Sequence, residues 1–296
     1  MPCYHPMQAY QAEDGKIVFD EIATKKHGGH LKTLTLPCGR CIGCRLKRTK
    51  SWAIRCMHEA QMHNENSFIT LTYNDEHYKL GLDYTDFQKF LDRMRKHKGR
   101  PTRYFAAGEY GDISNRPHWH ALLFGTTFPN LQQIGDNLWR SPELEQLWPY
   151  GFSSIGEVTF QSAAYVASYC TKKVNGPLAA QKYTRVNLQT GQIEKVQPEM
   201  ARMSLKPGIG ANWLRKYWPE VYAARDGVTM KGGFTMQAPR YYDKLMEKQD
   251  PETIENKQYE RYKKREQYIQ DSTQDRLTVR EKVATAKLNQ KQRKLR

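Results

Sequence analysis

Residues 116–124 read Arg-Pro-His-Trp-His-Ala-Leu-Leu-Phe, a proline-started apolar stretch that carries two histidines two positions apart. Successive side chains of a β-strand point to opposite faces, so His118 and His120 are expected on the same face. The apolar residues that follow indicate a strand inside the core rather than a flexible loop. Two imidazoles held side by side on a rigid strand can bind one metal ion. The rest of the chain can therefore be examined for what such a site needs.

A third metal ligand is expected on the strand before, residues 103–110, which read Arg-Tyr-Phe-Ala-Ala-Gly-Glu-Tyr. A turn-like stretch at residues 111–115 leads from it into the histidine strand, which predicts an antiparallel hairpin. In that hairpin the carboxylate of Glu109 comes alongside the two imidazoles, with Asp112 as the alternative ligand. Two histidines and one carboxylate leave coordination positions open for water or substrate oxygens, as cleavage of a phosphodiester requires. The alternative is a histidine pair that only makes hydrogen bonds.

Alternating strands and helices are predicted around this hairpin. Strands are expected at residues 67–73 and 151–160, and helices at 84–98, at 161–174 and, as one or two short helices, within 130–149. Further on, the patterns predict a turn at 189–192, a short basic aromatic helix at 213–218 and a loop or hairpin at 227–240. The expected fold class is α+β: a central antiparallel sheet flanked by helices, with the histidine strand in its middle.

Four regions are expected along the chain. They are a Cys-rich N-terminal segment (1–66), irregular until a helix starts near residue 49; a catalytic core (67–176); an accessory region packed on the core (177–243); and a basic extension (244–296). The extension has 15 Lys and Arg against 9 Asp and Glu with few large apolar residues, which predicts a helical or partly disordered tail outside the core.

The chain is strongly basic, with 47 Lys and Arg against 31 Asp and Glu and a net charge of +16. Such a surplus favours a polyanionic partner, nucleic acid before membrane, and the 18 tyrosines and 6 tryptophans offer stacking surfaces for unpaired bases. The alternative is a merely basic protein.

Because there is no apolar run of roughly 18 residues and no basic-then-apolar start, we expect a soluble intracellular protein with no membrane partner.

Three of the six cysteines, Cys38, Cys41 and Cys44, are spaced for metal coordination rather than for disulfides. Three thiolates leave a tetrahedral zinc site one ligand short, and Cys3 is the preferred fourth ligand. The competing fourth ligands are Cys56, His27 and His30. The alternative is a set of reduced thiols that pack a small subdomain; no catalytic role is expected of them.

The helix expected at residues 161–174 contains two tyrosines, Tyr165 and Tyr169, about 40° apart around the helix axis. Lys172 falls on the same face, and Lys173 fits that face less well. The apolar residues lie on the opposite side, namely Ala163, Val166, Ala167, Cys170 and Val174. Tyrosines that served only as core filling would have been on that apolar side, so the pair is a candidate for chemistry rather than an amphipathic surface pair.

A tyrosine that attacks a DNA phosphate leaves a covalent phosphotyrosine link and a free 3′-hydroxyl. Because the pKa of a phenol is ordinarily near 10, the attack needs help at neutral pH. A metal ion and the ammonium of Lys172 can stabilise the phenolate and the charge that develops on the phosphate. A second tyrosine one turn away allows a second transesterification before the first product leaves.

Several stretches resemble a known family. Pro117-His118-Trp119-His120 resembles the His-hydrophobic-His motif of HUH endonucleases, and residues 165–173 resemble their two-tyrosine motif. Residues 68–73 are similar to the first motif of these enzymes, and residues 108–111 to the segment that supplies their third metal ligand. Together with residues 37–44 and 239–244, these motifs resemble the replication initiation proteins of microviruses, most of all the gokushovirus branch, over residues 3–245.

The resemblance implies an HUH endonuclease-like fold and rolling-circle replication of a circular single-stranded DNA phage genome in the host cytoplasm. It implies nicking at phage origin DNA, a 5′ covalent link, later rejoining of a unit-length circle, Mg²⁺ or Mn²⁺ as cofactor, and a host helicase and DNA polymerase as partners. One departure is Ser168, where many related initiators have lysine between the tyrosines. The alternatives are an HUH plasmid initiator or transposase, and a non-catalytic zinc-containing DNA-binding regulator.

Overall fold

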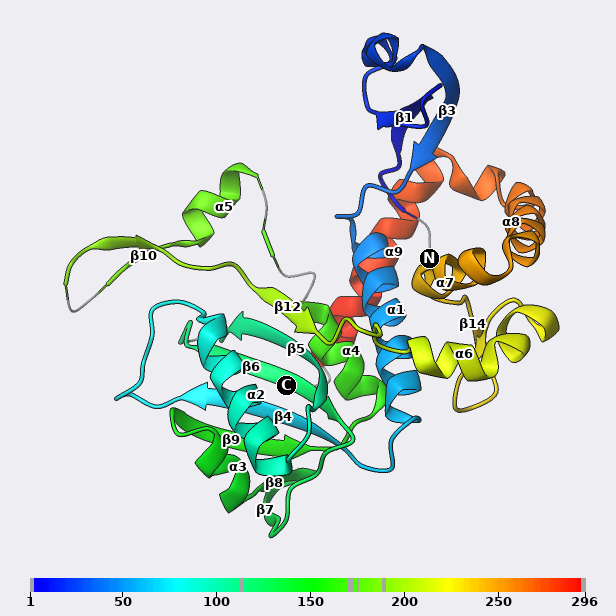
Figure 1. Cartoon of the computed structure of the whole chain (residues 1–296). Coiled ribbons are helices and arrows are strands. Elements are labelled where there is room, and N and C mark those ends of the chain that lie inside the picture. The colour runs from blue at the N-terminus through cyan, green and yellow to red at the C-terminus, as the bar shows by residue number, and fades with distance from the viewer. Residues whose placement is uncertain (1–2, 112–113, 170–172, 175, 188–189, 294–296) are drawn as a thin grey trace. The chain divides into compact units, whose positions relative to one another are not determined.

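The computed structural model describes residues 3–111, 114–169, 173–174, 176–187 and 190–293. For residues 291–293 it describes the backbone alone. The chain forms two compact units. Unit 1 consists of Met1–Arg48 and Glu255–Arg296, and unit 2 consists of Thr49–Ile254. Figure 1 shows the helices and strands of both. No helix in these ranges is both long enough and apolar enough to cross a membrane.

Unit 2 is built on a seven-stranded antiparallel sheet whose strand order is β12-β5-β6-β4-β9-β8-β7. The strands are β4 (Asn66–Tyr73), β5 (Arg103–Tyr110), β6 (Pro117–Phe124), β7 (Gln132–Gly135), β8 (Leu138–Arg140), β9 (Gly151–Gly156) and β12 (Met200–Met203). The histidine strand β6 lies between β5 and β4 and is therefore an interior strand of the sheet. The predicted central antiparallel sheet with flanking helices is confirmed.

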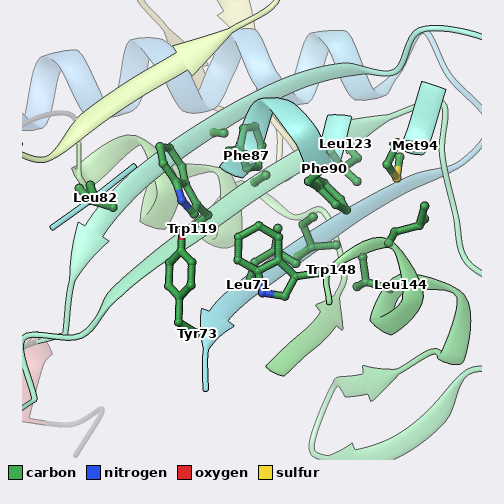
Figure 2. Close-up of a cluster of buried hydrophobic side chains, with 14 of the residues drawn as sticks. Leu71, Tyr73, Leu82, Phe87, Phe90, Met94, Trp119, Leu123, Leu144 and Trp148 are labelled. Atoms are coloured by element: carbon green, nitrogen blue, oxygen red, sulfur yellow. The ribbon is translucent and has the colours of Figure 1, made fainter. Parts of the chain in front are cut away.

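One face of the sheet is covered by α2 (Tyr84–Lys98), and this interface holds the largest apolar cluster. The Phe87 ring of α2 stacks on Trp119 of β6 with centroids 5.0 Å apart, and the Phe90 ring of the same helix meets Trp148 edge-on at 6.2 Å (Figure 2). Phe87 and Phe90 follow the helical spacing that predicted the helix, and the Asp83 side chain caps its start by accepting from the Thr85 amide. Burial of such aromatic side chains is what holds helix and sheet together.

A glycine makes room for the central tryptophan of that cluster. Gly108 of β5 is the residue directly opposite Trp119 in the β5–β6 pairing. A Cβ atom at this position would lie 2.9 Å from the indole ring and 2.9 Å from Leu82. The absence of a side chain at Gly108 therefore allows the Trp119 ring to approach β5 closely, which is a common reason for glycine inside a strand.

The opposite face of the sheet is covered by α4 (Phe160–Tyr169) and by the part of α1 (Ile42–Ala60) that belongs to unit 2. Alternation along β6 sends Trp119, Ala121 and Leu123 to the α2 face. Leu122 and Phe124 go to the α4 face, and by the same period the two histidines share that face. The sheet thus separates an apolar structural face from the face that holds the candidate site.

The remaining elements of unit 2 follow the sheet in the chain. They are α3 (Pro142–Leu147), α5 (Pro177–Lys182), β10 (Thr184–Val186), β11 (Ile193–Lys195), α6 (Ala211–Pro219), a π-helical turn (Glu220–Ala224), β13 (Val228–Thr229), β14 (Thr235–Met236), α7 (Arg240–Gln249) and the start of α8 (Pro251–Glu266). A third apolar cluster lies here, where the His58 ring stacks on Trp213 at 3.5 Å and its Nδ1 atom lies 2.9 Å from the Tyr242 hydroxyl. Burial lowers the pKa of His58 to about 3, so this ring is neutral.

Unit 1 contains a three-stranded antiparallel sheet of order β2-β1-β3. Its elements are β1 (Met7–Ala12), β2 (Ile17–Val18), a 3₁₀ turn (Ile22–His27), β3 (His30–Leu36), the first turns of α1, most of α8, a second 3₁₀ turn (Gln270–Ser272) and α9 (Gln274–Arg293). Its small apolar cluster is formed by Tyr4, Cys41 and Leu277. Segments from both ends of the chain therefore share one core.

Four predictions of secondary structure need correction. The N-terminal residues expected to be irregular form the β1–β3 sheet, and α1 begins at Ile42, so that Cys44 lies in its first turn. Residues 132–140 form the β7–β8 hairpin instead of a helix, because Asn137 adopts a left-handed φ of 54° at the turn. The strand expected at 151–160 ends at Gly156, and Phe160 already belongs to α4.

Apart from the end of the helix expected at 161–174, the other predicted elements are confirmed, including the helix at 213–218 and the hairpin at 227–240. The strands β10 and β11 pair on either side of the predicted turn at 189–192. The basic extension is helical in α8 and α9. It is not wholly outside the core, because Met246 and Ile254 are buried in unit 2 and Leu277 in unit 1.

Candidate metal and tyrosine site

The pairing of β5 with β6 brings Glu109 to the two histidines. Glu109 is directly opposite His118, and Ala107 is opposite His120. The Glu109 Oε1 atom lies 2.8 Å from Nε2 of His118 and 3.1 Å from Nε2 of His120. One ligand atom from each of the three residues lies within 4.8 Å of the others. The three residues thus form a compact two-histidine, one-carboxylate set.

Each imidazole is oriented through its other ring nitrogen. The Nδ1 atom of His118 donates to the backbone carbonyl of Arg116 at 3.1 Å, and Nδ1 of His120 lies 3.0 Å from the hydroxyl of Thr70. A neutral imidazole that donates from Nδ1 offers a lone pair on Nε2, and the carboxylate also only accepts. Either a proton or a metal cation must therefore lie between them. The donor set fits a divalent ion with positions left open for other ligands.

Glu109 is ionised even though it is buried. Burial by itself would raise the pKa of this carboxyl, but its hydrogen bonds with His118, His120 and Tyr169 outweigh that effect. The pKa of Glu109 is consequently held well below its usual range. A buried anion is expensive unless a cation or several donors compensate it, so this carboxylate is well prepared to bind a metal ion.

Both tyrosines of α4 contact the ligand set. The Tyr169 ring stacks on the His120 ring with centroids 5.1 Å apart and planes 7° apart. The Tyr165 ring meets the same imidazole edge-on at 5.1 Å and the Tyr169 ring at 4.9 Å. Two tyrosines and a potential metal ligand are thus in direct contact on one face of the sheet.

The two tyrosines differ in exposure. Tyr165 is 46% exposed, whereas Tyr169 is only 3% exposed. Burial raises the pKa of Tyr169 well above its usual range, and hydrogen bonds with Tyr165 and Glu109 raise it further. In this conformation Tyr169 is held as a neutral phenol, and Tyr165 is the tyrosine that a substrate can reach.

Small apolar residues allow α4 to approach the sheet closely. Ala163, Val166 and Ala167 are fully buried against the sheet, as their predicted apolar face requires. Reciprocal hydrogen bonds between Thr159 and Ser162 fix the first turn of the helix: the Thr159 amide donates to Ser162 Oγ at 2.8 Å, and the Ser162 amide donates to Thr159 Oγ1 at 3.1 Å.

Two residues of β4 belong to the site and were missed in the sequence. Thr70 is opposite His120 in the β4–β6 pairing and contacts its Nδ1 atom. The Phe68 ring stacks on His120 at 6.0 Å and meets Tyr165 edge-on at 6.3 Å. Both lie at alternate positions of a predicted strand, but their proximity depends on a register that the sequence does not specify.

Five of the predicted residues lie at or beyond the limits of the described site. Lys172, the expected assisting cation, and Asp112, the alternative ligand, lie outside the described residues, as does Cys170. Lys173 and Val174 are described and are not helical. The last described helical residue of α4 is Tyr169, so the helix predicted to reach 174 stops short of Lys173.

A second potential metal site lies in unit 1. The sulfur atoms of Cys3, Cys38, Cys41 and Cys44 are all within 4.8 Å of one another. The amide of Cys41 donates to the Cys38 sulfur at 3.3 Å, and the amide of Cys38 donates to the Cys3 sulfur at 3.2 Å. Burial would raise the pKa of Cys38, but hydrogen bonds from the Cys41 and Arg40 amides lower it to about 7. Four thiol ligands in this arrangement suit tetrahedral Zn²⁺.

The other three candidates for the fourth ligand of the cysteine cluster make contacts away from it. Cys56 is buried in the apolar cluster beneath α4. The His27 ring contacts the Asp14 carboxylate at 2.9 Å, and the His30 ring contacts the Thr33 hydroxyl at 3.1 Å. Among the four candidates for the fourth ligand, Cys3 is the one that the structure brings to the other three cysteines.

Comparison with known proteins points to phage replication. Residues 66–174 match the family model of the replication-associated protein ORF2/G2P. The chain is 34% identical over 266 residues to replication-associated protein VP4 of Bdellovibrio phage phiMH2K. This alignment covers 85% of the chain and 79% of that protein. The chain is 31% identical over 275 residues to replication-associated protein ORF2 of Spiroplasma virus 4, covering 84% and 81%.

A more distant match is replication-associated protein A of Enterobacteria phage phiX174, at 26% identity over 193 residues, 56% of this chain and 37% of that protein. No solved structure matches the chain significantly. The segment matched by the family model contains Glu109, both histidines and both tyrosines. The candidate site therefore lies entirely inside the part that this family model describes.

Proposed function

Because the chain belongs to the family of phage replication-associated proteins, as its resemblance to microvirus replication initiators predicted, we propose that it starts rolling-circle replication by nicking DNA. The nick is made in phage origin DNA, single-stranded or locally melted, by a tyrosine nucleophile of the HUH type. We assign the chemistry to residues 67–176. The observation that carries the proposal is the contact of Tyr165 and Tyr169 with His120 of the Glu109, His118 and His120 set.

The proposed nicking step exchanges one phosphodiester for another. Glu109, His118 and His120 would hold a divalent cation, Mg²⁺ or Mn²⁺ as the resemblance implies, and that ion would supply polarisation of the scissile phosphate. The exposed hydroxyl of Tyr165 loses its proton and attacks phosphorus, which forms a tyrosine–phosphate bond to the 5′ side. The bond from phosphorus to the 3′ oxygen breaks, and that oxygen takes up a proton to give a free 3′-hydroxyl.

Tyr169 is proposed to act in the second transfer. It is adjacent to Tyr165 on the same helix, so a second strand can be cut while the first remains attached. The 3′-hydroxyl released by this second cut then attacks the phosphorus of the first phosphotyrosine. A new phosphodiester closes the unit-length circle, the bond from phosphorus to the Tyr165 oxygen breaks, and that oxygen takes up a proton, so no external energy source is needed. We propose Lys172 as the cation that stabilises the phenolate, on the basis of helical spacing and resemblance.

The 3′-hydroxyl released by the first cut can prime DNA synthesis, so the proposed protein partners are host replication enzymes. A host DNA polymerase would extend it and a host helicase would unwind the template, as the resemblance implies. These steps would take place in the host cytoplasm. The four cysteines of unit 1 are proposed to hold a structural Zn²⁺.

The test of the function is adduct formation on origin DNA. A single-stranded origin oligonucleotide labelled at both ends is incubated with the full chain and Mn²⁺ and separated on a denaturing gel. We expect the 3′ fragment to migrate with the protein, and the 5′ fragment to be extendable by a polymerase on a complementary template. Binding of the oligonucleotide without any adduct would contradict the proposal and favour the non-catalytic DNA-binding regulator.

The zinc proposal predicts a loss of metal and of stability when two cysteines are replaced. Cys41→Ser/Cys44→Ser leaves two thiol ligands, too few for a structural zinc site, so bound zinc should fall from about one per chain to near zero. The thermal transition of unit 1 should move to lower temperature. Metal content is measured by mass spectrometry and unfolding by calorimetry. Cys56→Ala is the matched control, because Cys56 is outside the cluster; equal zinc in all three proteins would refute the site.

A further inference from the structure

The positive charge of the chain is concentrated in unit 1. The 90 residues of unit 1 contain 21 Lys and Arg against 10 Asp and Glu, a net charge of +11. The 206 residues of unit 2 contain 26 against 21, a net charge of only +5. The unit that holds the proposed nuclease site thus carries the smaller part of the charge. Most of the attraction for a polyanion must come from unit 1.

Three tyrosines of unit 1 expose their rings. Tyr259 and Tyr262 of α8 are each 58% exposed, and Tyr268, which follows that helix, is 63% exposed. The Lys263 Nζ atom lies 4.4 Å from the centre of the Tyr259 ring. The Tyr262 hydroxyl is hydrogen-bonded to the Glu266 side chain at the end of the same helix. Aromatic rings interleaved with basic side chains are what single-stranded nucleic acids stack on.

A cavity of about 490 Å³ lies beside one of these rings, that of Tyr268. Tyr268, Lys47, Arg265 and Arg280 line it, and so do the Cys3 and Cys44 side chains of the proposed zinc site. Arg280 is held in place by Asp271, whose carboxylate lies 3.2 Å from its guanidinium. Lys47 and Arg265 are exposed. A pocket of this size with cationic and aromatic lining suits one nucleotide with its phosphate.

We propose that unit 1 is a second DNA-binding module, which holds single-stranded DNA irrespective of its sequence. Bases stack on Tyr259, Tyr262 and Tyr268, and a backbone phosphate enters the cavity to meet Lys47 and Arg265. Duplex DNA fits less well, because its bases are already stacked on one another and present no free faces. The zinc ligands Cys3 and Cys44 fix one wall of the cavity, which gives the cysteine cluster a role in binding. This goes beyond the proposed function, since it requires no reaction at Tyr165 or Tyr169.

The proposal is tested by fluorescence anisotropy of a labelled 20-nucleotide oligothymidylate, without added divalent metal. Tyr259→Ala/Tyr262→Ala/Tyr268→Ala should weaken binding at least about 30-fold, because each stacked base contributes to affinity. The same three positions changed to phenylalanine keep the rings and should keep the affinity. Retained zinc content in both triple variants shows that unit 1 is folded.

The phosphate contacts are tested separately. Lys47→Gln/Arg265→Gln should reduce the slope of log affinity against log salt by about 1.4, the value for two contacts to single-stranded phosphates. The control Lys89→Gln/Lys96→Gln removes the same charge from exposed positions of α2 in unit 2 and should change the slope much less. Equal effects of the two pairs would show that only overall charge matters and would overturn the proposal.

Two further results would overturn it: unchanged oligothymidylate binding in the alanine triple variant, or tighter binding of a 20-base-pair duplex than of the single strand. Neither depends on catalysis. The alanine triple variant should still form the covalent adduct at saturating origin DNA. If the wild-type chain formed no adduct, the result would instead count against the proposed nuclease site in unit 2.

Discussion

Replacement of Tyr165 and Tyr169 together by phenylalanine is expected to lower covalent adduct formation on origin DNA by at least about 10³-fold. The substitution keeps both rings against His120 and removes only the hydroxyl groups, so the fold of α4 should be retained. Without these two hydroxyl groups the site loses both proposed nucleophiles. The rate is measured from denaturing gels in single-turnover conditions with Mn²⁺.

The single variants should separate the two tyrosines. Tyr165→Phe should lose most of the first cleavage, because Tyr165 is exposed and Tyr169 is buried. Tyr169→Phe should keep the first cleavage but fail to transfer a second strand. Tyr150→Phe, a matched change elsewhere in unit 2, should behave as the wild type. Full adduct formation in the double variant would show that the nucleophile is another residue.

Replacement of His118 and His120 together by alanine is the other change with a very large expected effect. Two of the three proposed ligands disappear, so Mn²⁺ affinity should fall by at least about 100-fold and metal-dependent cleavage should fall below detection. Isothermal titration with Mn²⁺ measures the first quantity and the gel assay the second. Oligothymidylate binding should be unchanged, because it is assigned to unit 1.

His97→Ala is the control for this pair. His97 is an exposed histidine of α2 whose ring contacts the Glu143 carboxylate at 3.3 Å. Its loss should leave both Mn²⁺ affinity and cleavage close to those of the wild type. Normal cleavage in the His118→Ala/His120→Ala variant would mean that the metal is bound elsewhere or that cleavage does not need one.

Local patterns were sufficient to anticipate much of the candidate site. The two-residue period of β6 placed His118 and His120 on one face, and the short connection from β5 predicted the hairpin that brings Glu109 beside them. Both patterns involve residues close in sequence. The contacts of Thr70 and Phe68 were not anticipated, because the pairing of β4 with β6 joins residues about 50 positions apart and its register is not encoded locally.

The exposure of individual side chains could not be predicted from local sequence patterns either. The helical period placed Tyr165 and Tyr169 on one face but could not show that one is exposed and the other covered, since this depends on how α4 lies on the sheet. The spacing of Leu131, Ile134 and Leu138 fits a helix, yet these side chains are exposed around a hairpin whose turn is made by Asn137. In unit 1, β1 and β3 are joined by a long connection and so gave no hairpin signal.

The most direct test of the account is to identify the residue that carries the DNA. The adduct formed by the wild-type chain is digested with nuclease and trypsin and analysed by tandem mass spectrometry. The tryptic peptide of residues 141–172 contains Tyr150 as well as the two candidate nucleophiles, so fragment ions are needed to assign the site. We predict a nucleotide on Tyr165 after one turnover and on Tyr165 or Tyr169 after several. A nucleotide on Tyr150 or on any residue outside α4, or cleavage without a linked peptide, would contradict the account.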